Sequence, residues 1–416
     1  ELDRVVVDEM DQAVAEYGTP RRTVLLDEAE DGTLTPVTPH GDDSVNAAAM
    51  KAAAAAATLS SAEADVAAAA AARKAGEDAA AVAALQIDDE PCTVMLGASG
   101  TIARSTPAAL DAWESRSTSD ERTKDDHIVS IFRTTTRSSY GLVTSAGRLV
   151  LAHVVELPAL AASPQTNVAG GIPADELIGM TESTDPIPGE HVVAAIPMDQ
   201  RDDGPTPAPL AIGTRAGVVK RWNREAPTTM DSWSVIDLKD GDSVLFAADA
   251  ADEDRLVFVA SDSSLLTFDA GNVRPQGRTA GGMAGIRLAE GCTAITFNVV
   301  PAGKIAWTYE EGDNGMFSAS GAVVLTVAGD KDALPGTENG AAKVTPLEMY
   351  PTKGRGTGGV RSQRFLKGQN TLIFAHVGMY PLHASTEGGS PVELPKPDMR
   401  RDASGVDLAA PVAFCG

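Results

Sequence analysis

Aromatic side chains and cysteines are scarce in this sequence, and long apolar runs are missing. Tyr, Trp and Phe make up 4% of the 416 residues, and there are three cysteines, Cys92, Cys292 and Cys415. The cysteines are far apart and form no CxxC pair, so reduced thiols in a cytoplasmic protein are the simplest interpretation. No apolar run reaches the ~18 residues of a membrane span and no leader is recognisable, so neither membrane insertion nor secretion is predicted.

Positive charge is also in short supply. The chain has 34 Lys and Arg residues against 58 Asp and Glu, a net charge of −24. Such a balance argues against a nucleic-acid partner. The deficit is uneven, however. Residues 1–90 hold 19 acids and 6 bases, a net charge of −13, which leaves −11 for the rest. Because salt screens charges beyond roughly 8–10 Å, local clusters of bases in the remainder can still matter.

The first part of the chain differs in amino-acid composition from the rest. Val6, Met10 and Val14 repeat every four residues and predict a short helix over 1–17, which Gly18 and Pro20 end. Residues 27–46 are acidic and polar, and residues 47–85 are dominated by alanine with almost no large apolar side chain. We therefore expect a helical end over 1–26, an acidic and Ala-rich linker or insert over 27–91, and a folded domain over 92–416. The first residue is Glu1, which suggests a fragment or a processed product.

From about residue 92 a pattern repeats in which two apolar strands flank a small turn. Glycine is frequent, with 39 residues, and Ser-Gly or Ala-Gly at the turn supplies the positive φ that tight hairpins need. The predicted hairpins cover 93–104, 140–153, 209–221, 255–268, 323–345 and 382–394. Six hairpins at intervals of roughly 50–70 residues indicate an all-β, propeller-like disc with six blades.

Glycine-rich basic segments follow two of these hairpins, namely GRTAGGMAGIRLAEG at 277–291 and YPTKGRGTGGVRSQRFLKG at 350–368. Both resemble the repeated phrase G-R-x-x-x-G-V-x-G-I-R-L in the C-terminal β-pinwheel of the A subunits of gyrase and topoisomerase IV, the bacterial type IIA DNA topoisomerases. AEYGTPRRT at 15–23 is similar to the phrase that closes the coiled coil of that family's cleavage domain. SPVELP (390–395) and RRDASG (400–405) resemble a second type IIA enzyme of actinobacteria.

The resemblance implies a six-bladed β-pinwheel that binds and bends duplex DNA without reading its sequence and presents it to the cleavage gate. Three basic clusters are candidate phosphate ligands, because Arg and Lys between glycines can approach a backbone. Lys343 begins the third cluster. The candidates are Arg215, Lys220, Arg221, Arg224, Arg274, Arg278, Arg287, Lys353, Arg355, Arg361, Arg364 and Lys367. Without the resemblance, a solvated charged rim is the better interpretation of the same residues.

The sequence offers no catalytic set. None of the five tyrosines stands in the Arg-Tyr context of the family's nucleophile, so cleavage or relaxation by this chain alone is not expected. Gly281, Gly282 and Gly285 lack the Lys-Ser/Thr end of a phosphate-binding loop, and the six histidines show no metal-ligand spacing. No cofactor is predicted here. In the whole enzyme the resemblance implies ATP and Mg²⁺ through other domains, and its implied protein partners are the B subunit of the topoisomerase plus a second A subunit.

One departure from the family concerns DNA wrapping. Gyrase carries a basic box, Gln-Arg-Arg-Gly-Gly-Lys-Gly, and the matching stretch WESRSTSDERTKDD at 113–126 has more acids than bases and no Gly-Gly. Relaxation or decatenation is therefore favoured over negative supercoiling. Two other interpretations stay open: an acidic propeller that binds proteins and has no role on DNA, and an enzyme with a site at the centre of the disc.

Overall fold

The computed structural model describes residues 26–28, 34–36, 88–109, 111, 124–160, 167–180, 187–198, 207–311, 317–334 and 338–416. The chain forms two units, Glu1–Gln86 and Ile87–Gly416. In the first, β1 (Leu26–Glu28) pairs antiparallel with β2 (Leu34–Pro36), a short hairpin inside the stretch predicted to be a linker. The predicted helix over 1–17 and the Ala-rich tract lie outside the described residues.

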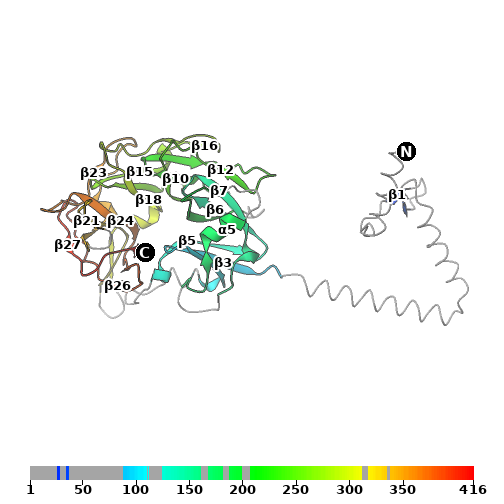
Figure 1. Cartoon of the computed structure of the whole chain (residues 1–416), viewed down its shortest axis with the longest axis horizontal. Coiled ribbons are helices and arrows are strands. Elements are labelled where there is room, and N and C mark those ends of the chain that lie inside the picture. The colour runs from blue at the N-terminus through cyan, green and yellow to red at the C-terminus, as the bar shows by residue number, and fades with distance from the viewer. Residues whose placement is uncertain are drawn as a thin grey trace, which may run out of the picture. The chain divides into compact units, whose positions relative to one another are not determined.

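The second unit is a ring of six sheets, or blades, as predicted, in which all strands pair antiparallel except β16 with β11 (Figure 1). Each begins with one of the predicted hairpins. The hairpins are β3 (Pro91–Gly97) with β4 (Thr101–Ser105), β6 (Ser139–Thr144) with β7 (Arg148–His153), β10 (Leu210–Thr214) with β11 (Val218–Trp222), β14 (Arg255–Ala260) with β15 (Ser264–Asp269), β21 (Ala322–Gly329) with β22 (Ala341–Pro346), and β25 (Ala384–Ser385) with β26 (Pro391–Val392).

A third strand pairs with the first strand of each hairpin. In blades 1 to 6 these are β5 (Ile128–Thr135), β9 (Val192–Pro197), β13 (Val244–Asp249), β18 (Ala294–Val300), β24 (Thr371–Met379) and β28 (Phe414–Cys415). Only one α-helix longer than a single turn is described, α5 (Ala174–Met180). A further hairpin, β19 (Thr308–Glu311) with β20 (Phe317–Ser320), is inserted between blades 4 and 5.

The outer strand of blades 1 to 5 comes from the following repeat along the chain. These exchanged strands are β8 (Ile172–Pro173), β12 (Ser232–Ser234), β16 (Pro275–Gln276) with β17 (Met283–Ala284), β23 (Val360–Arg361) and β27 (Val406–Asp407). We call the chain between the second and third strand of a repeat its crossover segment. For the repeats of blades 2 to 6 these segments are 154–191, 223–243, 270–293, 347–370 and 393–413. Each of blades 1 to 5 is therefore joined to the next by a strand that pairs with it through hydrogen bonds.

A single hydrogen-bond pattern anchors every exchanged strand. The residue at the hairpin tip has positive φ, at Gly100, Gly147, Gly217, Ser263 and Gly340. Its carbonyl accepts a backbone N–H from the incoming segment, as when Ile286 donates to Gly217 at 3.0 Å and Ser362 donates to Ser263 at 2.7 Å. At blade 4 a serine replaces the usual glycine. Its Oγ accepts from the backbone N–H of Gln363 at 2.7 Å, which offsets part of the cost of the left-handed conformation.

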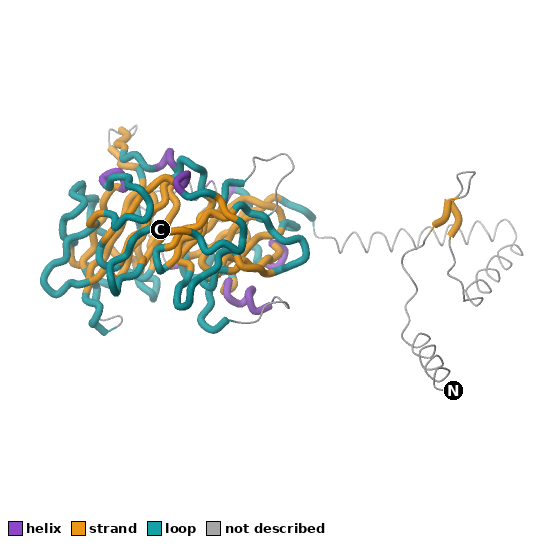
Figure 2. Tube along the Cα trace, turned by 90° about the horizontal axis from the view of Figure 1, so that it is seen from above, coloured by secondary structure: helices purple, strands orange, loops and turns teal. Residues whose placement is uncertain are grey.

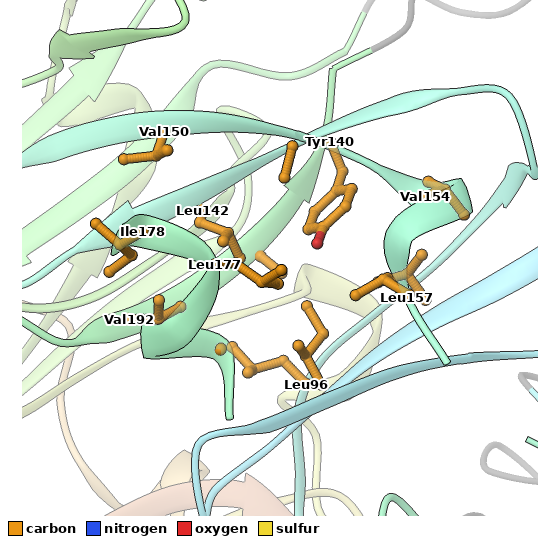
Figure 3. Close-up of a cluster of buried hydrophobic side chains, with 14 of the residues drawn as sticks. Leu96, Tyr140, Leu142, Val150, Val154, Leu157, Leu177, Ile178 and Val192 are labelled. Atoms are coloured by element: carbon orange, nitrogen blue, oxygen red, sulfur yellow. The ribbon is translucent and has the colours of Figure 1, made fainter. Parts of the chain in front are cut away.

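The hydrophobic core is divided among the seams between blades. At the first seam Leu96, Leu142 and Val192 meet Leu177 and Ile178 of α5 (Figure 3). Similar clusters fill the seams between the later blades. Because burial of such side chains contributes about 1.5–3 kcal/mol each, the seams hold the ring together.

Blade 6 meets blade 1 without a strand exchange. The His127 ring Nε2 lies 3.0 Å from Ser385 Oγ, and the buried His127 packs beside Gly416. Gly416 and His383 exchange two backbone hydrogen bonds of 3.0 and 3.1 Å. The outer strand β26 begins at Pro391, which has no N–H to offer a further strand, so the outer edge of blade 6 is protected.

Candidate nucleic-acid interface

The crossover segments carry the exposed side chains of the rim, and loops surround the strand-rich body in the view of Figure 2. Their charge varies sharply from blade to blade. Segment 154–191 has six acids and no Lys or Arg, 223–243 has five acids and two bases, and 393–413 has four acids and three bases. By contrast, 270–293 has three bases and one acid, and 347–370 has five bases and one acid. Positive charge is therefore concentrated on two consecutive crossovers.

These two crossovers lie side by side. The backbone N–H of Arg287 donates to Thr357 O at 3.0 Å, and that of Gly356 donates to Gly285 O at 2.5 Å. The Arg355 guanidinium donates from Nε to Asn272 O at 3.0 Å. The two segments thus contact each other, and we call their exposed cations together the basic arc. Its residues are Arg274, Arg278, Arg287, Lys353, Arg355, Arg361, Arg364 and Lys367.

Within the arc, some cations are more available than others. Arg355 also donates from Nη1 to Ala284 O at 3.4 Å, and Lys353 Nζ donates to Gly359 O at 3.0 Å. These two side chains brace the loop backbone. For Arg278, Arg361 and Arg364 the described contacts involve backbone atoms, and their side chains are exposed. These three side chains are available to meet a phosphate, as are the exposed side chains of Arg274, Arg287 and Lys367.

Three sequence-predicted phosphate ligands are directed into the protein, and their assignment to the interface was wrong. Lys220 is 0% and Arg221 is 1% exposed, while the side chain of Arg224 is 7% exposed. Arg221 donates to the carbonyls of Ala250, Ala270 and Val273 and pairs with Asp252 at 2.7 Å. Arg224 donates to Pro197 O at 3.0 Å and pairs with Asp249. Arg215, at the exposed tip of the third hairpin, stays a prediction.

Lys343, the first base of the third predicted cluster, is buried as well, at 2% exposure. The sequence carries a signal for both buried lysines, because each stands inside an apolar strand three residues after the glycine of the turn, in GVVKRW and GAAKVT. The pattern of charge alone groups them with the neighbouring exposed bases and misses their structural role.

The glycines of the arc serve mainly the strand exchange. Gly282 and Gly359 have φ of 78° and 72°. A Cβ at Gly359 would lie 2.3 Å from Leu265 O, and one at Gly282 would lie 2.8 Å from Val219 O. Only glycine lets the incoming segment approach the hairpin this closely. The Gly281–Gly285 stretch therefore surrounds the exchanged strand β17, and this pairing accounts for its glycines without a nucleotide loop.

No catalytic centre emerges from the described residues. Burial raises the pKa of the Tyr140 and Tyr350 hydroxyls above the usual value, and Tyr350 donates to Ser362 O at 3.4 Å, so both tyrosines are core residues. In the described ranges no group of three His, Cys, Asp or Glu side chains could hold a metal ion. None of the helices described there is both long and apolar enough to cross a membrane.

Known proteins share this sequence pattern. The family model of the DNA gyrase C-terminal domain, a β-propeller, matches residues 254–295 and 336–377. The A subunit of DNA gyrase from Mycobacterium leprae is 26% identical over 294 residues, which are 68% of this chain and 20% of that protein. Its counterpart from Salmonella typhimurium is 25% identical over 254 residues, 61% of this chain and 24% of that protein. The chain thus spans less than a third of the length of these relatives.

The fold has a counterpart among solved structures. The C-terminal domain of DNA topoisomerase IV matches with a TM-score of 0.55 and 18% identity, over 80% of this chain and 94% of that one. The architecture is thus the β-propeller of topoisomerase C-terminal domains. In sequence and in fold the chain is therefore similar to the C-terminal region of the A subunits of type IIA DNA topoisomerases.

Proposed function

We propose that the basic arc binds duplex DNA by its phosphates. The observation that carries this proposal is the pairing of two crossovers, 270–293 and 347–370, into one exposed cationic surface on an otherwise acidic chain. Guanidinium groups match phosphate oxygens well and stay charged at any physiological pH. Contacts to the backbone position a protein on DNA but carry no sequence information, so binding without sequence preference follows.

The arc covers only part of the rim, which limits the DNA path. The crossovers on either side, 223–243 and 393–413, carry more acids than bases and would repel a duplex that continued past the arc. The blade-1 loop 106–127, where the gyrase box would fall, has six acids and three bases, and most of it lies outside the described residues. We infer that the domain holds and bends a short segment and does not wrap DNA around the whole ring.

In the whole enzyme this domain would present one DNA segment to the cleavage gate. The relatives are the A subunits of gyrases, and by analogy the intact protein would work in the cytoplasm with the B subunit of the enzyme plus a second A subunit, using ATP and Mg²⁺ bound elsewhere. The restricted arc favours relaxation or decatenation over supercoiling. The resemblance to a second actinobacterial enzyme stays a prediction.

A salt titration with matched variants tests the DNA role. Replacing Arg278, Arg361 and Arg364 with Gln removes three cations from the arc, whereas replacing Lys239, Lys304 and Lys331 with Gln removes three exposed cations from other places. Each lost phosphate contact should lower the slope of log K against log salt by about 0.9, so the arc variant should lose about two to three units. The control variant should keep the slope. Equal slopes in the unaltered chain and the arc variant would favour a protein-binding propeller instead.

A further inference from the structure

Two lysines occupy the same buried position in blades 3 and 5. Lys220 in β11 and Lys343 in β22 each follow the positive-φ glycine of their turn by three residues. They are 0% and 2% exposed. Burying an ammonium group is costly unless all its N–H donors are paired, so such a residue is kept only where its hydrogen bonds matter.

Lys220 bridges two consecutive crossovers. Its Nζ donates to Val235 O at 2.7 Å, in segment 223–243, and to Arg278 O and Ala280 O, both at 2.8 Å, in segment 270–293. The three donors of the ammonium are therefore all used. One acceptor is the carbonyl of Arg278 itself, a residue of the basic arc. The contact fixes the backbone from which that guanidinium extends.

Lys343 bridges the next pair of consecutive crossovers, two blades further round the ring. Its Nζ donates to Ser362 O at 3.1 Å, in segment 347–370, and to Arg401 O at 2.9 Å, in segment 393–413, and its third donor reaches Thr345 Oγ1. Ser362 stands directly after Arg361 and two residues before Arg364. The second buried ammonium thus holds the other half of the arc.

Few charged groups act on the two ammonium groups. Burial lowers the pKa of Lys220 to about 8, and Asp237 acts in the opposite direction. Burial also lowers the pKa of Lys343 to about 8; Asp398 and Asp402 act to raise it, and Arg400 acts to lower it. Both groups remain mostly protonated at neutral pH and lose a donor in mildly alkaline solution.

We propose that Lys220 and Lys343 are positioning residues of the DNA-binding surface, which bridge successive crossovers and thereby set the spacing of the exposed arginines. The proposal rests on the DNA role of the arc, but the bridges themselves can be tested without DNA. Neither ammonium can reach a phosphate, so any effect on DNA must pass through the loop backbone. The geometry assigns Lys220 to segments 223–243 and 270–293, and Lys343 to segments 347–370 and 393–413.

The first test is amide hydrogen exchange on the full chain carrying Lys343→Met, a substitution that keeps an unbranched side chain of similar length. Exchange should speed up in segments 347–370 and 393–413 and stay unchanged in segment 270–293. Lys220→Met should give the reverse pattern, with faster exchange in 223–243 and 270–293 only. Uniformly faster exchange throughout the ring, or none in the bridged segments, would contradict the assignment.

The second test is DNA binding by the same variants, at a temperature where circular dichroism shows them folded. Lys343→Met should bind a linear duplex about tenfold more weakly, a loss of about 1.4 kcal/mol. It should also lower the salt slope by about one unit, as for the loss of one phosphate contact. Lys304→Met removes the same charge from an exposed lysine outside the arc and should change neither value. A slope equal to that of this control would overturn the positioning role.

A pH profile separates positioning from a merely structural role. A neutral amine donates two hydrogen bonds where the ammonium donates three, so affinity of the unaltered chain should fall as pH rises from 7 to 9. The double variant Lys220→Met, Lys343→Met should lack this fall, because nothing remains to titrate at the bridges. The same profile in both proteins would contradict the proposal. If the unaltered chain shows no salt-dependent binding at all, the DNA role fails, while the exchange experiment still decides on the bridges.

Discussion

The crossovers of blades 3 and 4 have the same backbone plan, yet their charges are opposite. In both, the incoming segment donates a backbone N–H to the carbonyl of the hairpin tip, Val235 to Gly147 at 2.9 Å and Ile286 to Gly217 at 3.0 Å. Segment 223–243 nevertheless carries five acids and two bases, whereas 270–293 carries one acid and three bases. The plan of the exchange is thus independent of surface charge. The basic character of the second segment needs an explanation outside folding, and the proposed DNA binding would provide it.

The largest expected effect comes from disrupting the docking of an exchanged strand onto its hairpin. Gly359→Ala places a Cβ 2.3 Å from Leu265 O on a backbone with φ of 72°. The exchanged strand β23 must then shift, and the free energy of unfolding should fall by about 2–3 kcal/mol in chemical denaturation. Gly354→Ala, in the same crossover, has open space around it and should stay within about 0.5 kcal/mol of the unaltered chain. Equal losses in the two variants would mean that the exchanged strand does not depend on the close approach.

A smaller effect should follow from changing the surface charge of a crossover while leaving its strand exchange intact. Asp231 and Asp240 are exposed in the acidic segment 223–243. Replacing both with Lys extends the cationic surface toward blade 2, and the salt slope of DNA binding should rise by about one to two units. Stability should change by less than about 0.5 kcal/mol, since both side chains lie on the surface. An unchanged slope would show that DNA does not pass over this crossover, which would narrow the interface to the arc itself.

The smallest effect concerns the one tip that departs from glycine. Ser263→Gly relieves a positive φ of 71° but removes the Oγ that accepts from Gln363 N at 2.7 Å and donates to Gln363 O at 2.7 Å. Two buried hydrogen bonds outweigh the relief of strain, and a loss of about 1 kcal/mol is expected in thermal or chemical unfolding. A stabilised variant would indicate that the tip geometry alone decides how firmly the exchanged strand docks.

The hairpins could be predicted from sequence because their signals are local. Apolar residues on both sides of a turn glycine define β10 and β11, and a similar pattern recurs at each blade. The exchanged strands could not be predicted in this way. They are only two or three residues long, and Val360 pairs with Leu265, which lies almost a hundred positions earlier in the chain. Such short, distant pairings leave no periodicity to detect.

The candidate interface was predicted in part, for a related physical reason. The Gly-rich segments marked where exposed bases gather, and the arc contains eight of the twelve predicted ligands. Lys220 and Arg221 were misplaced because a base inside a strand is ordinarily half exposed, and here a crossover from the following repeat covers it. Arg224, just after β11, was misplaced because its side chain binds Pro197 O and Asp249. The β1–β2 hairpin was missed because its strands have three residues each in a polar stretch.

The central claim is that DNA rests on the two basic crossovers and avoids the acidic ones. Hydrogen exchange of the full chain with and without a linear duplex, at low salt, tests it most directly. The account predicts slower exchange confined to segments 270–293 and 347–370, where bound phosphates would restrain the loops, with no change in 223–243 or in the described part of 154–191. Protection spread evenly over all crossovers, or protection of the acidic segments alone, would contradict it.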